Sequence, residues 1–131
     1  RPLLERFELS DRRDALAQSL SRGMRQKLAI CCAYLHRPAA ILFDEPMTGL
    51  DPRGIRTLRE SIVERAAEGA AVIISSHLLS LIEGHCSHLL ILHEGKCLFL
   101  GTLEDARKRY PTLQGNASLE EIFFEATRTA P

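Results

Sequence analysis

The sequence has 131 residues, of which 45% are hydrophobic and 26% are charged. These proportions are typical of a globular domain and exclude a largely disordered chain. The 17 basic residues balance the 17 acidic residues, which removes any general electrostatic attraction to nucleic acid or to an anionic membrane. No apolar run approaches the roughly 20 residues of a membrane-spanning helix. The chain starts at Arg1 with neither a Met nor a signal-like segment, so we expect residues to be missing upstream.

The first predicted element is a helix that begins after Ser21. Serine is a favourable N-cap residue, and the helix is expected to end near His36 because Pro38 follows it. The apolar face of this helix is expected to consist of Met24, Leu28, Cys31, Cys32 and Leu35.

A strand–helix–strand unit follows. Short apolar runs at residues 41–43 and 71–74 predict strands that are buried on both faces, as in a parallel sheet. Between them, apolar residues at helical spacing over 55–66 predict a helix that stops at Gly69. The crossover of this unit is expected to be right-handed.

The remaining segment begins with a predicted hairpin. Apolar runs at residues 89–92 and 97–100 flank a short link that contains a glycine. Ser118 and Glu121 fit a capping box for a C-terminal helix, and residues 110–117 are predicted to be the linker before it. The elements together predict an α/β fold class, with a mostly parallel sheet, flanking helices and an antiparallel hairpin.

Two acidic residues, Asp44 and Glu45, follow the first predicted strand. In open α/β sheets, ligands bind at the carboxyl ends of the strands. A first carboxylate at this edge can hold Mg²⁺ through water, and a second can orient or deprotonate an attacking water. The alternative is that both residues only begin a solvated turn before Pro46.

Three further segments contain candidate binding residues. Ser21 and Gly23 stand at the start of a helix, where free N–H groups favour a phosphate, and a plain N-cap is the alternative for Ser21. His77 follows the second strand, where it is either an imidazole that binds a phosphate oxygen or an ordinary surface residue. Residues 48–51 predict a turn into the next helix, with Asp51 as its expected cap.

In this order, the motifs resemble those of ABC-type ATPases, the nucleotide-binding subunits of ABC transporters. Residues 20–26 resemble the signature motif, residues 41–45 the Walker B strand with its catalytic glutamate, and residues 48–51 the D-loop, while His77 resembles the switch histidine. The resemblance covers residues 3–124. It implies the C-terminal half of a P-loop NTPase domain of the RecA-like, ABC type.

The signature segment departs at two positions from the commonest family form, Leu-Ser-Gly-Gly-Gln. Arg22 stands in place of the first Gly, and Met24 stands in place of the Gln. Ser21 and Gly23, which would approach phosphate, are retained. The resulting form resembles a variant of the ABC-2 exporter branch.

The resemblance implies a role for each motif residue. Asp44 would help to hold Mg²⁺ through water, Glu45 would polarise the attacking water, and His77 would contact the γ-phosphate of ATP. The signature residues that would bind the nucleotide of a partner domain in trans are Ser21, Arg22, Gly23, Met24 and Gln26. The D-loop residues would be Gly49, Leu50 and Asp51.

The implied cofactors are ATP and Mg²⁺. The implied partners are a second nucleotide-binding domain, paired head to tail, and a transmembrane permease subunit, with no nucleic acid expected. These partners place the protein in the cytoplasm, at the inner face of the cell membrane. The sequence contains no Gly-x-x-x-x-Gly-Lys-Ser/Thr phosphate loop, so ATPase activity is expected of the full-length protein and not of this fragment alone.

The expected domain organisation has three parts. Residues 1–20 are the end of the helical subdomain that carries the signature, residues 21–109 are the C-terminal half of the ATPase core, and residues 110–131 are a linker and a C-terminal helix. The alternatives for function are an ABC-type ATPase of DNA repair, chromosome maintenance or translation, and a non-catalytic regulatory domain. A zinc site among the His and Cys residues of 85–97 is a weaker alternative, because their spacing matches no zinc-finger pattern.

Overall fold

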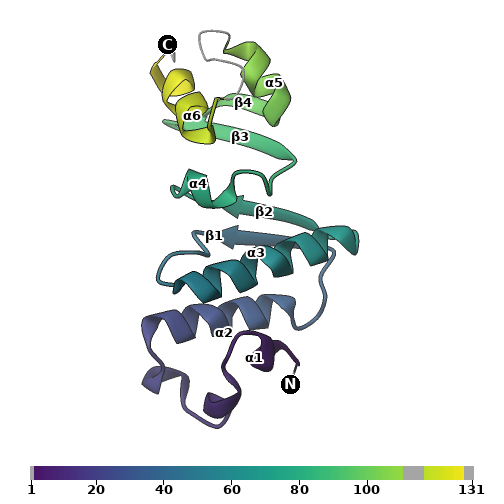
Figure 1. Ribbon diagram of the computed structural model, residues 1–131, viewed down its shortest axis with the longest axis vertical. Helices are drawn as coiled ribbons and strands as arrows, with labels where there is room; N and C mark the ends of the chain where they lie inside the picture. The colour runs from purple at the N-terminus through teal and green to yellow at the C-terminus, as the bar shows by residue number, and fades with distance from the viewer. Residues whose placement is uncertain (1, 111–116, 129–131) are drawn as a thin grey trace. The chain divides into compact units, whose positions relative to one another are not determined.

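The computed structural model describes residues 2–110 and 117–128, in two units, Arg1–His77 and Leu78–Pro131. The elements are shown in Figure 1. In chain order they are α1 (Pro2–Arg6), two 3₁₀ turns (Ser10–Arg12 and Ala17–Ser19), α2 (Arg22–Tyr34), β1 (Ala40–Asp44), α3 (Pro52–Ala67), β2 (Ala71–Ser75), α4 (Leu79–Ile82), β3 (His88–His93), β4 (Lys96–Thr102), α5 (Leu103–Arg109) and α6 (Leu119–Arg128).

The first unit is built on a parallel pair of strands. β1 and β2 pair in register from Ala40 opposite Ala71 to Asp44 opposite Ser75, and α3 connects them along one face (Figure 1). This arrangement confirms the predicted strand–helix–strand unit. Because the strands are parallel, Asp44 and Ser75 end the pair at the same edge.

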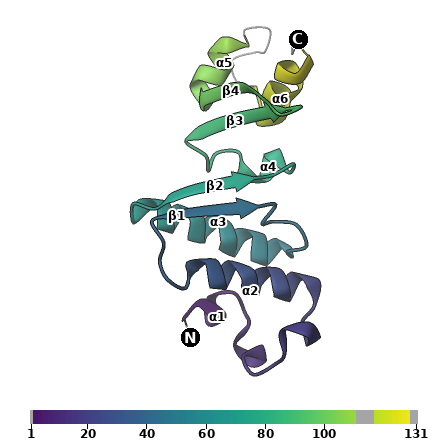
Figure 2. The ribbon, with the colours of Figure 1, turned by 180° about the vertical axis from the view of Figure 1, so that it is seen from behind.

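The two strands are buried on one face only, so the prediction of burial on both faces is wrong. Ile41 and Phe43 are buried, whereas Leu42 is 74% exposed and Ile73 on β2 is 62% exposed. Side chains alternate between the faces of a strand, and α3 covers one of these faces. Figure 2 shows the opposite face, over which no helix of the described residues 2–77 passes.

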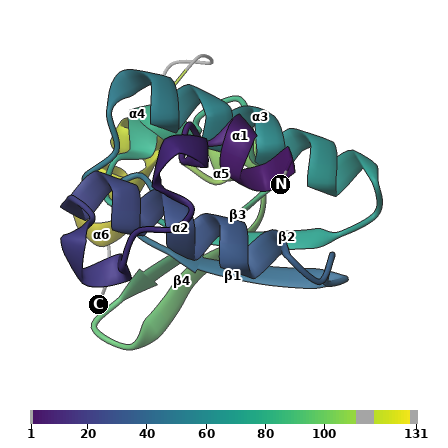
Figure 3. The same ribbon diagram turned by 90° about the horizontal axis from the view of Figure 1, so that it is seen from below.

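Helix α2 begins where predicted, but its buried face matches the predicted one only in part, with Cys31 buried and Met24 and Leu28 half-buried. Its buried residues are Lys27, Ile30, Cys31 and Tyr34. Cys32 and Leu35, which the spacing placed on the apolar face, are exposed. The orientation follows from the neighbours, because α1 lies beside α2 (Figure 3) and the ring of Tyr34 meets Phe43 edge-on with centroids 5.7 Å apart.

The second unit contains the predicted hairpin. β3 and β4 pair antiparallel from His88 opposite Thr102 to His93 opposite Lys96, as a sheet separate from that of β1 and β2. Glu94 and Gly95 form the two-residue turn, with φ values of 48° and 76°. Two left-handed residues match the twist of the strands in such a turn.

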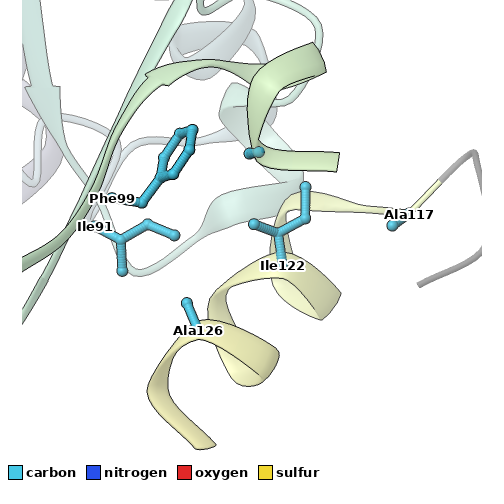
Figure 4. Packing of buried hydrophobic residues seen from close by; sticks show 6 residues of the cluster. Ile91, Phe99, Ala117, Ile122 and Ala126 are labelled. Carbon is cyan, nitrogen blue, oxygen red and sulfur yellow. The ribbon is translucent and has the colours of Figure 1, made fainter. Parts of the chain in front are cut away.

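Two helices, α5 and α6, cover this hairpin. The buried side chains that they share with it are Ile91, Phe99, Ala106, Ala117, Ile122 and Ala126 (Figure 4). The predicted capping box is confirmed: the Ser118 N–H donates to Glu121 Oε2 over 2.7 Å, and the Glu121 N–H donates to Ser118 Oγ over 3.2 Å.

Helix α5 was not predicted from the apolar pattern. A second capping box begins it, in which the Asp105 N–H donates to Thr102 Oγ1 over 3.1 Å and Asp105 Oδ2 accepts from the Thr102 N–H over 3.3 Å. The sequence Thr-x-x-Asp was therefore the available signal. Of the predicted linker, residues 111–116 lie outside the described residues.

Candidate functional site

The carboxylate of Asp44 lies at the end of β1, beside the end of β2. Ser75 is its register partner, and the Ser75 hydroxyl donates a hydrogen bond to Asp44 Oδ1. A charged acceptor makes this a strong hydrogen bond, which fixes the orientation of the carboxylate. Ser75 comes directly after the second predicted apolar run, and nothing in the sequence indicated this contact.

Glu45 follows in an unusual backbone conformation. Its φ is 46°, in the left-handed region that costs a non-glycine residue of order 1 kcal/mol. The Glu45 N–H donates to the Ser75 carbonyl over 3.1 Å and lies 3.2 Å from Ser75 Oγ. These contacts offset the cost, because they hold the peptide in the bend that turns the chain away from the sheet.

Glu45 and His77 meet at this edge through two contacts. The His77 N–H donates to Glu45 Oε1 over 2.9 Å, and His77 Nδ1 lies 2.8 Å from Glu45 Oε2. The second contact requires a proton on Nδ1, which leaves Nε2 as the ring nitrogen that a ligand can reach. With side-chain exposures of 37% for Glu45 and 67% for His77, both groups are open to solvent and to a bound substrate.

The signature residues stand at the start of α2. Ser21 is the N-cap, and its Oγ accepts from the Met24 N–H over 3.2 Å. The N-cap alternative for Ser21 is therefore confirmed, while a role of this helix start toward phosphate stays a prediction. Arg22, Gly23 and Met24 form the first turn of the helix.

The D-loop packs against this first turn at van der Waals distance. A Cβ added at Gly23 would lie 2.7 Å from the carbonyl oxygen of Gly49, so only glycine fits there. Gly49 has a φ of 81°, and the side chain of Arg22 passes within 3.3 Å of the position that a Cβ would occupy there. Two motifs separated by about 25 residues in the sequence thus share one backbone contact.

Asp51 takes the expected N-cap position of α3, but its side chain makes no capping hydrogen bond. Its Oδ1 lies instead 3.1 Å from Lys27 Nζ, on α2. The hydrogen bond from Lys27 lowers the pKa of Asp51 below its ordinary value. Lys27 is a residue that sequence reasoning missed, because a lysine on a helix with an apolar face gives no local sign of its partner.

Gln26 forms a hydrogen bond with the turn that follows Glu45. Its Nε2 donates to the carbonyl of Pro46 over 3.1 Å and so links α2 to the turn that follows Glu45. Leu50 closes a further turn of the D-loop, since its N–H donates to the Met47 carbonyl over 3.2 Å. Gln26 therefore ties α2 to the turn before the D-loop, whereas the Leu50 hydrogen bond lies within the turn itself.

The groups at the strand ends suit a magnesium ion. Asp44 and Ser75 supply oxygen atoms, which Mg²⁺ prefers, and one carboxylate suffices for an ion that keeps most of its waters. No three His, Cys, Asp or Glu side chains in residues 2–110 and 117–128 gather as a metal-binding group. The residues proposed for zinc between 85 and 97 form no such group within these ranges.

None of the helices in the described part of the chain has the length and apolar character needed to cross a membrane.

Residues 2–83 match the family model described as "AAA domain, putative AbiEii toxin, Type IV TA system". EcsA of Bacillus subtilis (strain 168), an ABC-type transporter ATP-binding protein, is 37% identical over 127 residues, which are 97% of this chain and 51% of EcsA. SrtF of Streptococcus pyogenes, a lantibiotic transport ATP-binding protein, is 35% identical over 93% of this chain and 49% of SrtF.

The structural comparison agrees. A solved "Structure of ATP binding subunit of ABC transporter" superposes with a TM-score of 0.90 at 40% identity, over 96% of this chain and 52% of that one. The chain thus spans about half the length of the relatives and of the solved subunit that it matches.

Proposed function

Because this chain belongs to the ABC-type ATPases, the ATP-binding subunits of ABC transporters, we propose that it supplies one half of an ATP hydrolysis site. The observation that carries the proposal is the edge of β1 and β2, where Asp44, Glu45 and His77 lie within one set of hydrogen bonds. The names of the relatives favour a transporter subunit over an ATPase of DNA repair, chromosome maintenance or translation.

In this proposal each residue at the edge has one task. Asp44, oriented by Ser75, would hold Mg²⁺ through water, and the ion would supply charge neutralisation for the phosphates of ATP. Glu45 orients the attacking water and accepts its proton. His77, held by Glu45 at Nδ1, donates from Nε2 to a phosphate oxygen, a contact that requires a proton on Nε2 as well as on Nδ1.

The signature and D-loop act on a partner domain. Ser21, Arg22, Gly23, Met24 and Gln26 lie at or near the start of α2, where N–H groups and the helix dipole favour the phosphates of a nucleotide held by the partner. Gly49, Leu50 and Asp51 face the same partner. The proposed assembly is a head-to-tail dimer of nucleotide-binding domains, attached to a transmembrane permease at the cytoplasmic side of the membrane, as an exporter of the ABC-2 type.

We expect the 131-residue chain to hydrolyse no ATP by itself, because its sequence contains no phosphate loop. The activity is expected in a chimaera in which this chain replaces the matching region of EcsA, which then contributes its remaining half. Binding of ATP by the chimaera reports whether it has folded.

The test is Glu45→Gln in the chimaera, which removes the proton acceptor and keeps the shape of the side chain. We expect ATP turnover to fall by about 100-fold or more while ATP binding is retained. Glu94→Gln, at an exposed glutamate of the hairpin turn, is the matched control and should leave turnover unchanged. Turnover retained in Glu45→Gln would refute the role of Glu45, and turnover by the 131-residue chain alone that Glu45→Gln abolishes would refute the expected inactivity.

A further inference from the structure

Lys27 is a buried cation between two carboxylates from distant parts of the chain. The residue is 9% exposed, and its Nζ lies 3.1 Å from Asp51 Oδ1 and 3.4 Å from Glu8 Oε2. Glu8 belongs to the segment before the signature, whereas Asp51 ends the D-loop. A buried ammonium group without partners is costly, so its position on α2 and the positions of the two carboxylates depend on one another.

Gly54, in the first turns of α3, provides the space for this ion pair. A Cβ added there would lie 2.9 Å from Lys27 Cε and 2.9 Å from Asp51 Oδ1. Glycine inside a helix is less favourable than alanine by about 1 kcal/mol. Glycine at this position therefore makes the helix less stable, but it allows Lys27 and Asp51 to form their ion pair.

The D-loop is held against α2 at two points. At Gly49, its backbone touches the helix start at Gly23, where no side chain fits. At Asp51, Lys27 holds the carboxylate from one turn further along α2. A segment held at both points has one position relative to the signature helix, whereas a segment held only at Gly49 can pivot.

We propose that Lys27 is a positioning residue that fixes the D-loop to the signature helix, so that both reach the partner's nucleotide in one geometry. The expected effect of Lys27 on ATP turnover rests on the proposed ATPase function. Its expected effect on the position of the D-loop rests on the Lys27–Asp51 ion pair alone. Lys27 itself contacts no nucleotide in this proposal. Its effect on turnover comes through Asp51 and the loop that precedes it.

The structural consequence is tested in the 131-residue chain by hydrogen exchange of the D-loop amides. Lys27→Met removes the cation and leaves Glu8 and Asp51 with side-chain exposures of 57% and 50%, where water solvates them, so the fold should persist. We expect exchange at Leu50 and Asp51 to become about tenfold faster, and Lys27→Arg to restore most of the protection. Lys108→Met, the same change at an exposed Lys108–Glu104 pair, is the matched control.

Gly54→Ala is a second variant that keeps all three charges. The added methyl group separates Lys27 from Asp51, while alanine favours the helix. We expect faster exchange in the D-loop without a loss of helix protection in α3. This combination distinguishes positioning from general destabilisation, and it remains available if Lys27→Met fails to fold.

The kinetic consequence is tested in the EcsA chimaera. We expect Lys27→Met to lower kcat about tenfold, with KM for ATP changed less than threefold, because the D-loop acts after nucleotide has bound. The double variant with Asp51→Asn should be no slower than the slower single variant. The proposal would be overturned if hydrogen exchange in the D-loop were unchanged in both Lys27→Met and Gly54→Ala. It would also be overturned if the parent chimaera were active and Lys27→Met left its kcat unchanged. An inactive but folded parent chimaera would instead refute the ATPase function and leave the exchange result to decide the positioning role.

Discussion

The hydrogen bond between Tyr34 on α2 and Ser61 on α3 predicts an unequal response to removal of its two partners. Both residues are buried, with exposures of 5% and 2%, and their hydroxyl oxygens lie 2.9 Å apart. Ser61 Oγ donates its one proton to the Leu58 carbonyl over 2.6 Å. The Tyr34 hydroxyl must therefore be the donor to Ser61, and burial raises the pKa of Tyr34.

The magnitudes follow from which group is left without a partner. Tyr34→Phe removes the donor and keeps the ring contact with Phe43, so the expected cost is about 1 kcal/mol. Ser61→Ala leaves the buried Tyr34 hydroxyl without a hydrogen-bond partner, which should lower the free energy of unfolding by about 2 kcal/mol. The better helix propensity of alanine reduces this loss by about 0.5 kcal/mol. The double variant, Tyr34→Phe with Ser61→Ala, leaves no buried hydroxyl without a partner. We expect it to be more stable than Ser61→Ala alone by about 1 kcal/mol.

The assay is urea unfolding of the 131-residue chain, with hydrogen exchange read on peptides from α2 and α3. These peptides report the free energy of unfolding of the first unit, separately from the hairpin and its helices. Tyr110→Phe, outside this unit, serves as the control for loss of a phenolic hydroxyl. A double variant that is as unstable as Ser61→Ala, or less stable, would refute the assignment of Tyr34 as donor.

Three further outcomes are expected. Burial raises the pKa of the Cys31 thiol to about 11, so at pH 8 iodoacetamide should label exposed Cys32 first and Cys31 only after unfolding, as peptide mass spectrometry would show. Since Lys27 lowers the pKa of Asp51, their pair stabilises the fold above the ordinary carboxyl pKa and loses this effect as the pH falls through the lowered value; the stability difference between the wild type and Asp51→Asn should therefore vanish in acid unfolding titrations. Ser118→Ala should destabilise α6 by about 1 kcal/mol, measured by exchange of its first amides, and protection that stays unchanged would contradict the capping box.

The pair of β1 and β2 was predicted to be buried on both faces, and it is buried on only one. A continuous apolar run indicates that a strand is suited to burial on both faces. It does not specify which elements of the described chain cover those faces. Leu42 and Ile73 are exposed because α3 covers only one face of the pair within the described residues of the first unit. The same limit explains α2, where spacing alone favoured Leu35 and the neighbouring elements selected Tyr34.

The sequence by itself determined the features that depend on near neighbours. The caps at Ser21 and Ser118, the glycine-containing link of the hairpin and the acidic end of β1 each follow from residues within about five positions of one another, where backbone geometry decides the outcome. The order of the motifs also identified the ATPase family that the comparisons support.

Only the tertiary structure decided how those motifs contact one another. The Ser75 hydroxyl on Asp44, the left-handed backbone of Glu45 and the burial of Lys27 against Asp51 join residues that lie 24 to 31 positions apart or depend on such contacts. Their partners are set by the pairing of strands and the packing of helices, which no local pattern encodes. The sequence therefore identified the groups proposed to carry the chemistry. The fold determined that Ser75 and Lys27 hold Asp44 and Asp51 in place.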